Sequence, residues 1–367
     1  MKNLIFLFLI SVWSSSYAQR ILIADNNLNA PQGDDVFPTA QQAVDAAVDG
    51  DIVQIAPSDT NYGDIVISKS VTILGIGYNP NKDSPYLSAL NNIDLSGPEA
   101  SGTILSGLIT NVINLVTDTG VPYSQNEVTI QSCRLNRVVQ NTNNIVSNLL
   151  LTKCIINNSG GSFAVPIALA FDSNILTSEI SNNIIDGYRG GVNAIGSVSA
   201  GNFTVIRNNL FIGPNNVNYT FAFQYLQNCI VSNNIFFGRS PWSVSNGISE
   251  NNTYSNNLSF GMNPTMPPPS TGTGSNTGTG NIENTDPMFT SIALGSIWDF
   301  AFDITLQPGS PAIGSGTDAT DLGILGGSEP FVNYGTGSPI PVIRQLNTPG
   351  LVNEGENLQI SIEAEGN

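Results

Sequence analysis

The chain has 367 residues, of which only 11% are charged, and 28 acidic against 11 basic residues make the formal net charge −17. Exposed helical faces are normally built from charged residues and Gln, so this composition excludes a mainly helical protein. The 40% hydrophobic content excludes a disordered chain.

The net charge and the His content exclude several classes of binding partner and of active site. A strongly negative surface repels nucleic acid and anionic membranes, so we expect neither as a partner. The sequence has no His. This removes the usual catalytic base, the Ser-His-Asp and Cys-His arrangements, and most zinc and copper sites.

Residues 1–18 are predicted to be a secretory signal peptide. Lys2 precedes an apolar run from Leu4 to Val12, and small residues lead to Ala18, after which we expect cleavage. The run is too short to cross a bilayer. We therefore expect a secreted protein, extracellular or on the cell surface, with no membrane insertion.

A short amphipathic helix is predicted near the start of the mature chain. Thr39 and Gln42 form a capping box, and Gly50 is expected to end the helix. Its apolar face consists of Ala40, Ala43, Val44, Ala47 and Val48. We expect this helix to cover the N-terminal end of the fold and to stabilise it, without a chemical role.

The central part of the chain contains an internal repeat of about 25 residues, a period typical of solenoids. Each unit has a short β-like run, a polar or glycine turn and another short run. The units are LSGLITN (105–111), QSCRLNR (131–137), TKCIINN (152–158), SNNIIDG (181–187), RNNLFIG (207–213), SNNIFFG (232–238) and SNNLSFG (255–261). This pattern predicts a β-solenoid.

Stacked coils place equivalent residues ~4.8 Å apart, so like residues lie on like. The central column reads Leu108, Cys133, Cys154, Asn183, Asn209, Asn234 and Asn257. Its asparagines predict an Asn ladder. The column beside it, predicted to fill the core, is Ile155, Ile184, Leu210, Ile235 and Leu258.

The three cysteines do not form a disulfide framework. Cys133 and Cys154 are interpreted as small buried thiols, and a disulfide between them stays open. No feature of the sequence assigns a state to Cys229.

The sequence resembles secreted right-handed parallel β-helix proteins of the pectin-lyase-like superfamily. Besides the repeats, the matching stretches are FPTAQQAVDAAVDGDIVQIAP (37–57), ISKSVTILGIG (67–77), DPMF (286–289) and LQPGSPAIGSGTDATDLGILGG (306–327), the last two being similar to the family's final coils. The resemblance implies an all-β, right-handed parallel β-helix (β-solenoid) with an N-terminal capping helix, as one domain over residues 19–338.

Two segments depart from the repeat. Residues 262–281 are rich in Pro, Gly, Thr and Ser without apolar periodicity, which predicts a long exposed loop within the domain. Residues 339–367 form a C-terminal strand or tail segment. There Leu358, Ile360 and Ile362 alternate with polar residues, which favours a strand that pairs along the solenoid or leads into another module.

The resemblance implies two chemistries. Lyases of the superfamily abstract the proton beside a uronate carboxylate with Lys or Arg, aided by Ca²⁺ or another neutralising group. The hydrolase pattern of aspartates with Gly-His-Gly is absent. The catalytic candidates are Lys153, Arg189, Arg207 and Arg239, and the candidate Ca²⁺ ligands are Glu179 and Asp186. The alternative is solvated surface charge that confers solubility and blocks lateral association.

Aromatic residues near coil turns form a third group of candidates. Rings that stack on a sugar face would bind a glycan without catalysis. The candidates are Tyr188, Tyr225, Trp242 and Tyr254. The alternative is ordinary packing of loops against the coil wall.

The sequence thus favours a monomeric extracellular protein that binds or processes a polysaccharide or cell-surface glycan, with lyase-type β-elimination as the expected chemistry. A non-catalytic cell-surface or adhesion scaffold is the alternative.

Overall fold

A computed structural model describes residues 19–28, 30, 33–79, 86–116, 123–140, 144–158, 169–170, 177–187, 192–195, 204–213, 221–242, 248–333, 342–347 and 361–365. The predicted signal peptide, residues 1–18, lies outside this range. None of the helices described is long and apolar enough to cross a membrane.

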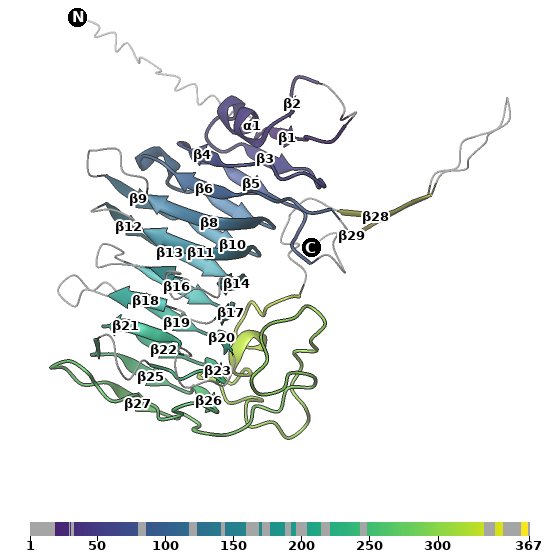
Figure 1. Cartoon of the computed structure of the whole chain (residues 1–367). Coiled ribbons are helices and arrows are strands. Elements are labelled where there is room, and N and C mark those ends of the chain that lie inside the picture. The colour runs from purple at the N-terminus through teal and green to yellow at the C-terminus, as the bar shows by residue number, and fades with distance from the viewer. Residues whose placement is uncertain are drawn as a thin grey trace, which may run out of the picture.

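Two long parallel sheets form walls of a β-solenoid (Figure 1). Sheet 1 has 12 strands in the order β2 (Val36–Phe37), β1 (Ile21–Ala24), β3 (Ile52–Ile55), β5 (Thr72–Leu74), β7 (Ile104–Ser106), β10 (Thr129–Gln131), β13 (Leu149–Thr152), β16 (Ser178–Ser181), β19 (Thr204–Arg207), β22 (Ile230–Ser232), β25 (Thr253–Ser255) and β27 (Thr277–Thr279).

Sheet 2 has 13 strands. Its main path runs β24 (Ser249–Glu250), β21 (Phe223–Gln227), β18 (Val192–Ile195), β15 (Leu169–Ala170), β11 (Arg134–Gln140), β14 (Ile155–Asn158), β17 (Ile184–Gly187), β20 (Leu210–Ile212), β23 (Ile235–Phe237) and β26 (Leu258–Phe260). Off this path are β4 (Ile65–Ile67), β6 (Asn92–Leu95) and β8 (Ile109–Val116). A small parallel pair joins β9 (Ser124–Asn126) to β12 (Ile145–Ser147). The predicted parallel β-helix is therefore confirmed.

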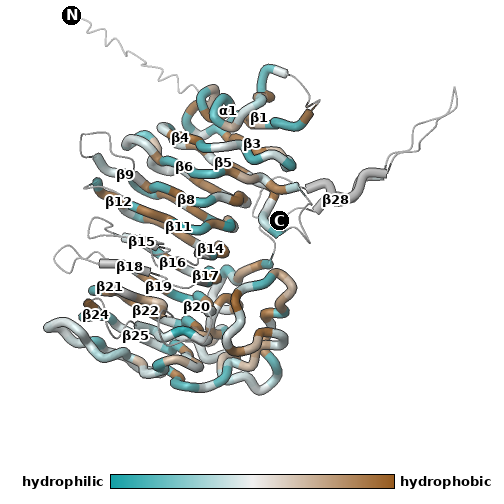
Figure 2. Tube along the Cα trace, in the orientation of Figure 1, coloured by the Kyte–Doolittle hydropathy of each residue, from teal (hydrophilic) through white to brown (hydrophobic). Residues whose placement is uncertain are grey.

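The interior is built from the middle residue of each short strand, because side chains alternate between the two faces of a strand. In sheet 1 this inner row includes Ile73, Leu105, Ile130, Leu151, Ile180, Ile206, Val231 and Tyr254, all fully buried. Figure 2 shows the resulting alternation of hydrophobic and hydrophilic residues along the coils. Phe211 stacks on Phe236 with ring centroids 5.0 Å apart, which continues the like-on-like stacking.

The predicted Asn ladder is present at the corner between the two sheets. The backbone N–H of Asn183 donates to Asn209 Oδ1 at 3.0 Å, and Asn209 N–H donates to Asn234 Oδ1 at 2.9 Å. Asn234 bonds Asn257 in the same way at 3.0 Å. The ladder continues one coil further than predicted, because Asn257 N–H donates to Asn281 Oδ1 at 3.0 Å.

The residue before each ladder position makes the corner. Asn182, Asn208, Asn233 and Asn256 have φ between 52° and 58°. Asn is among the few residues that enter this left-handed region readily. Each Asn-Asn pair thus has two roles: the first residue turns the backbone, and the second bonds the next coil.

Thiols replace amides at the start of the ladder. Cys133 N–H donates to Cys154 Sγ at 3.4 Å, and Cys154 N–H donates to Asn183 Oδ1 at 2.9 Å. The Cys154 thiol donates to Thr152 O at 3.3 Å, as the Asn234 amide donates to Ser232 O at 3.0 Å. Both cysteines, and Cys229, are buried thiols that take no part in a disulfide. Burial raises the pKa of the Cys154 thiol well above its usual value, so it remains a neutral donor.

A second ladder, which the sequence analysis missed, lies at the corner that leads into sheet 1. Cys229 N–H donates to Asn252 Oδ1 at 2.9 Å, and Asn252 N–H donates to Asn276 Oδ1 at 3.0 Å. Asn228 and Asn251, with φ of 56° and 57°, form the preceding turns. The signal for this ladder was the Asn-Cys and Asn-Asn pairs five and six residues before the predicted column.

The prediction of a loop throughout residues 262–281 is wrong for its last residues. β27 pairs in parallel with β25, and Asn276 and Asn281 extend both ladders. The coil that contains β27 is therefore stabilised by backbone pairing and by the ladder amides of Asn276 and Asn281, and not by apolar side chains. Its inward position is Gly278, where a Cβ would lie 2.6 Å from Tyr254 O.

The aliphatic column of Ile155, Ile184, Leu210, Ile235 and Leu258 does not fill the interior as predicted. It lies on the outer face of sheet 2, because each residue follows an inward-pointing ladder residue. Residues 282–333, which we call the C-terminal segment, bury this column with side chains that include Phe289, Trp298 and Ile324. Residues 286–289 and 306–327 are therefore not final coils but a cover on the outside of the solenoid (Figure 1).

The N-terminal helix α1 (Ala40–Ala46) lies at the first end of the stack (Figure 1). Its cap is as predicted: Thr39 Oγ1 accepts from Gln42 N–H at 3.2 Å. Two details differ from the prediction. Val48, predicted to lie on the apolar face, is 50% exposed, and the helix ends at Ala46, before Gly50. The 3-10 turns η1 (Pro98–Ala100) and η3 (Gly323–Leu325) complete the helical elements described.

At the C-terminus, β28 (Val342–Asn347) pairs antiparallel with β29 (Ser361–Glu365). Within the part of the chain that the structure describes, these strands pair with each other and not along the solenoid, so that alternative of the tail prediction is wrong.

The ladder predicts a selective effect on stability. Asn234→Leu keeps the branched shape of the side chain but leaves the buried Asn209 N–H without its acceptor, so we expect the free energy of unfolding to fall by about 2–4 kcal/mol. Cys154→Asn, which places an amide where a thiol already fills the ladder position, should change it by less than about 1 kcal/mol. Urea unfolding measures both variants, and equal losses would contradict a ladder role for the side chains.

Candidate functional site

Two catalytic candidates lie at the same edge of sheet 1. Lys153 directly follows β13, and Arg207 ends β19, with β16 between them. The register Thr152–Ser181–Arg207 places both residues at the corner that faces the C-terminal segment. Each of them forms its own ion pair.

Arg207 pairs with a residue of the neighbouring strand. Its Nη2 lies 2.7 Å from Glu179 Oε1, and both side chains are 34% exposed. Its charge also helps to lower the pKa of Asp318 in the C-terminal segment, although the hydrogen bond from the Thr320 hydroxyl has the larger effect. Glu179, predicted as a Ca²⁺ ligand, is therefore the counter-ion of Arg207.

Lys153 binds the C-terminal segment directly. Its Nζ lies 2.5 Å from Glu329 Oε2, and this hydrogen bond and charge lower the pKa of Glu329. Lys153 has a φ of 55°, so it occupies the corner position that Asn182 and Asn208 occupy in later coils.

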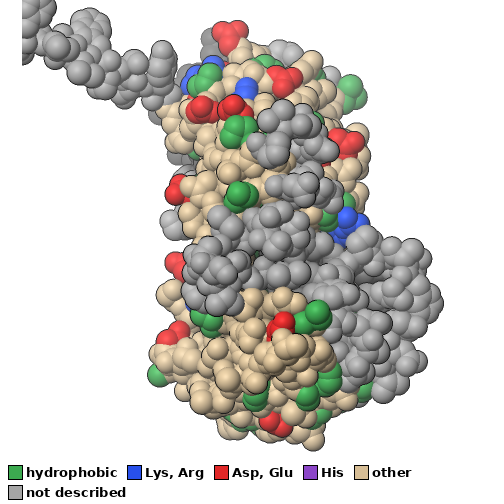
Figure 3. Space-filling model, turned by 90° about the vertical axis from the view of Figure 1, so that its left-hand side faces the viewer, with side chains coloured by type: hydrophobic (Ala, Val, Ile, Leu, Met, Phe, Trp, Pro, Cys, Tyr) green, Lys and Arg blue, Asp and Glu red, His purple; other side chains and the backbone are tan. Residues whose placement is uncertain are grey.

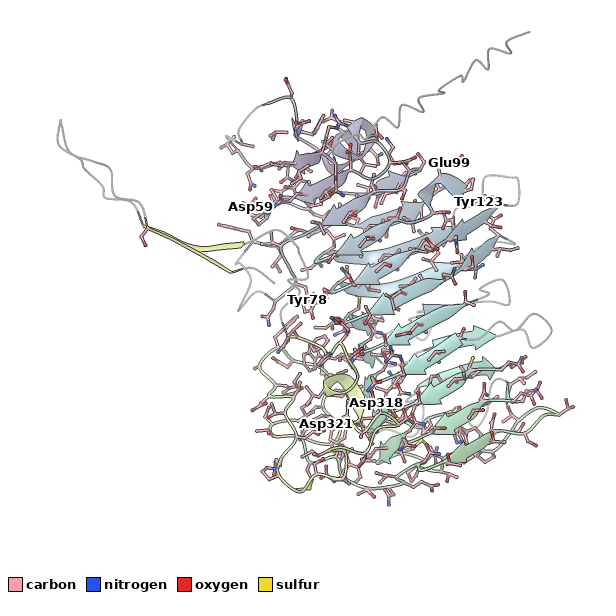
Figure 4. The ribbon with its side chains drawn as sticks, turned by 180° about the vertical axis from the view of Figure 1, so that it is seen from behind. Asp59, Tyr78, Glu99, Tyr123, Asp318 and Asp321 are labelled. Carbon is pink, nitrogen blue, oxygen red and sulfur yellow. The ribbon has the colours of Figure 1, made fainter. Side chains whose placement is uncertain are left out.

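The other corner residues also bond the C-terminal segment. Asn182 Nδ2 donates to Gly326 O at 2.8 Å, and Asn256 Nδ2 donates to Ser315 O at 2.9 Å. Between them, Thr317 N–H donates to Asn233 Oδ1 at 2.9 Å. Figure 4 shows Asp318 and Asp321 on this segment beside the solenoid strands. We call this line of contacts the corner seam; Lys153 and Arg207 lie along it.

Arg239 does not lie on the surface as predicted. It is 1% exposed, and its Nη1 donates to Ile185 O at 3.2 Å. The side chain crosses Gly213, where a Cβ would lie 3.1 Å from Arg239 Cγ. Burial lowers its pKa to about 10, and the charge of Asp186 opposes that shift.

Asp186 is buried beside Arg239. It is 3% exposed, and its Oδ2 accepts from Trp298 N–H at 3.0 Å. Asp186 lies on the outer face of sheet 2 beneath the C-terminal segment, whereas Glu179 lies on sheet 1. The structure therefore does not bring the two predicted Ca²⁺ ligands together. Among the residues described, no group of three or more His, Cys, Asp or Glu could hold a metal ion.

The structure also places the four aromatic candidates in different environments. Tyr254 is fully buried in the core, so the expectation of an exposed ring is wrong, and burial raises its pKa. Trp242 is partly buried, and its backbone N–H donates to Ser240 Oγ at 3.3 Å. Tyr225 lies on β21, and at this position the structure describes only the backbone. Tyr188 and Arg189 lie outside the described residues.

The outer face of sheet 1 is a surface that the sequence analysis did not single out. Its side chains form two in-register rows from β5 to β27. The first row is Thr72, Ile104, Thr129, Leu150, Glu179, Val205, Ile230, Thr253 and Thr277; the second is Leu74, Ser106, Gln131, Thr152, Ser181, Arg207, Ser232, Ser255 and Thr279. The charged members of both rows are Glu179 and Arg207, which pair with each other.

No protein-family model and no curated protein matches the sequence. Among solved structures, the pectate lyase Pel9A is similar at 13% identity with a TM-score of 0.47, covering 84% of this chain and 96% of that chain. A mannuronic acid specific polysaccharide family 6 lyase from human gut microbiota is similar at 14% identity with a TM-score of 0.28, covering 66% of this chain and 54% of that chain.

Arg239 generates a prediction about the solenoid and its cover. Arg239→Met removes the cation beside buried Asp186, so we expect a loss of about 3–5 kcal/mol in the free energy of unfolding. Asp186→Asn in the same chain should restore part of the loss, because the buried charge is then gone. A double-mutant cycle by urea unfolding measures the coupling, and strictly additive losses would contradict it.

Proposed function

We propose that this protein is a carbohydrate-directed β-helix protein that works outside the cell and binds a linear polysaccharide along its solenoid. The observation that carries the proposal is the pair of in-register rows on sheet 1, which repeat every ~4.8 Å along one straight face. A surface with a translational repeat suits a ligand with a translational repeat, since successive units meet rows of side chains at a constant spacing. The predicted signal peptide supports the extracellular location.

The placement of the basic candidates favours binding over elimination by those residues. A lyase base must reach the substrate proton, and a nearby cation must stabilise the developing negative charge. Lys153 bonds Glu329, Arg207 bonds Glu179, and Arg239 is buried. These contacts connect the coils and the C-terminal segment, so we assign the three residues to the structure of the fold.

The second candidate function is a non-catalytic surface or adhesion scaffold. The corner seam favours this second function, because Lys153 and Arg207 form ion pairs along it that hold the coils and the C-terminal segment together. The two candidates differ in whether a glycan binds the solenoid itself.

Binding to a panel of polysaccharides tests the proposal. The probes are insoluble cellulose and soluble galactomannan as uncharged chains, and polygalacturonate and alginate as charged chains, each with and without Ca²⁺. We expect the folded protein to be retained by at least one of them, as measured by co-sedimentation and affinity electrophoresis. Retention by none, with folding verified by circular dichroism, would favour the scaffold.

A pair of variants separates structural from catalytic roles of the seam. Lys153→Met and Arg207→Met each remove one partly exposed ion pair, so we expect a loss of about 0.5–1 kcal/mol in the free energy of unfolding. Polysaccharide binding should be unchanged in Lys153→Met, because Lys153 lies outside the two rows of sheet 1. Formation of unsaturated uronate product by the wild type, measured by ultraviolet absorbance and abolished in either variant, would reverse this assignment.

A further inference from the structure

We infer that the ligand surface is the outer face of sheet 1 over its last strands, β22 to β27, and that the ligand is an uncharged linear polysaccharide. The inference rests on the function proposed above and specifies its site and its ligand class. We call this surface the terminal face; its side chains are Ile230, Ser232, Thr253, Ser255, Thr277 and Thr279.

The first argument is charge. The chain carries a formal net charge of −17, yet none of the residues that define the terminal face is charged. The nearest charges in the two rows, Glu179 and Arg207, neutralise each other at 2.7 Å. A polyuronate would meet repulsion from the rest of the chain without a compensating cation on this face. An uncharged chain meets no such penalty.

The second argument is the chemistry of the two rows. The first row offers apolar and methyl groups, with Ile230 38% exposed and Thr253 and Thr277 exposed. The second row offers the hydroxyls of Ser232, Ser255 and Thr279. A pyranose ring has an apolar C–H face and a polar hydroxyl edge, so a chain that lies along the solenoid axis would contact both rows at once.

The third argument is accessibility. In earlier coils most of the second row is closed, since Ser106, Thr152 and Ser181 are buried, whereas Gln131 is partly exposed. In the last coils Ser232 and Ser255 are partly exposed and Thr279 is exposed. Within the described residues, the C-terminal segment covers the apolar column of sheet 2 rather than this face (Figure 1). Parallel sheets usually have both faces covered, so an open, uncharged face suits a bound ligand.

The chain contains a matched control for a test. The tripeptide Ile-Val-Ser occurs as β22 and again as β12, with the same exposed–buried–intermediate pattern. Ile230 is 38% exposed and Ile145 is 37% exposed. Ile230 lies on the terminal face, whereas Ile145 lies on the small sheet of β9 and β12.

The experiment compares Ile230→Lys with Ile145→Lys in the full chain. We expect Ile230→Lys to weaken binding to cellulose or galactomannan about tenfold or more, because it places a charged side chain within an uncharged contact surface. Ile145→Lys should bind as the wild type does. Affinity should not depend on salt, as no ion pair is formed with the ligand. Thr253→Lys, at an exposed site, should reproduce the loss if Ile230→Lys is unstable.

Each of the other possible outcomes would contradict a different part of the inference. Binding to polygalacturonate or alginate alone, weakened by salt, would overturn the ligand class and leave the proposed function intact. Binding that Ile230→Lys and Thr253→Lys leave unchanged, or that Ile145→Lys weakens equally, would overturn the site. A wild-type dimer in sedimentation that Ile230→Lys dissociates would assign the face to a second copy of the chain. Retention by no probe would remove the proposed function as well.

Discussion

The structure depends on parallel coils that stack in register. Each coil turns at a corner where one residue adopts a left-handed conformation and the next is buried. A buried polar side chain at that position must be bonded, and the carboxamide meets this need by accepting from the coil before it and donating to strand carbonyls. Asn209 does both, accepting from Asn183 N–H at 3.0 Å and donating to Ile180 O at 2.8 Å.

This constraint also explains the low charge of the chain. In register, any side chain lies ~4.8 Å from its equivalents above and below. Like charges at that spacing would repel, whereas Asn, Ser, Thr and aliphatic groups attract their copies. On the face shown in Figure 3, uncharged groups make up most of the described surface, acidic side chains are scattered over it and gather near its top, and basic ones are few. Among the described basic residues, Lys153 and Arg239 lie where the C-terminal segment meets the coils, whereas Arg20 and Lys69 form bonds around the N-terminal helix.

The C-terminal segment changes the surroundings of several residues on the outer face of sheet 2 from solvent to a buried core. Without it, the outer face of sheet 2 would expose a column of Ile and Leu side chains, and Asp186 and Arg239 would face solvent. With it, the column becomes a second hydrophobic core that includes Phe237 and Trp298, and the two charged groups become buried. The outer face of sheet 1, by contrast, is left open by this segment in the described part of the chain.

The sequence by itself determined the repeat, the parallel β-helix, the first Asn ladder and the cap of the helix at Thr39. All of these follow from local patterns that recur with the coil period, and each pattern has one stable way to stack. Only the tertiary structure decided whether the residue after each ladder position points into the solenoid or away from it. Side chains alternate along a strand, but the sequence pattern does not say which of the alternating residues point inward. The tertiary structure also decided the partners of Lys153, Arg207 and Arg239, since Glu329, Glu179 and Ile185 lie in other coils or in the segment that folds back over them.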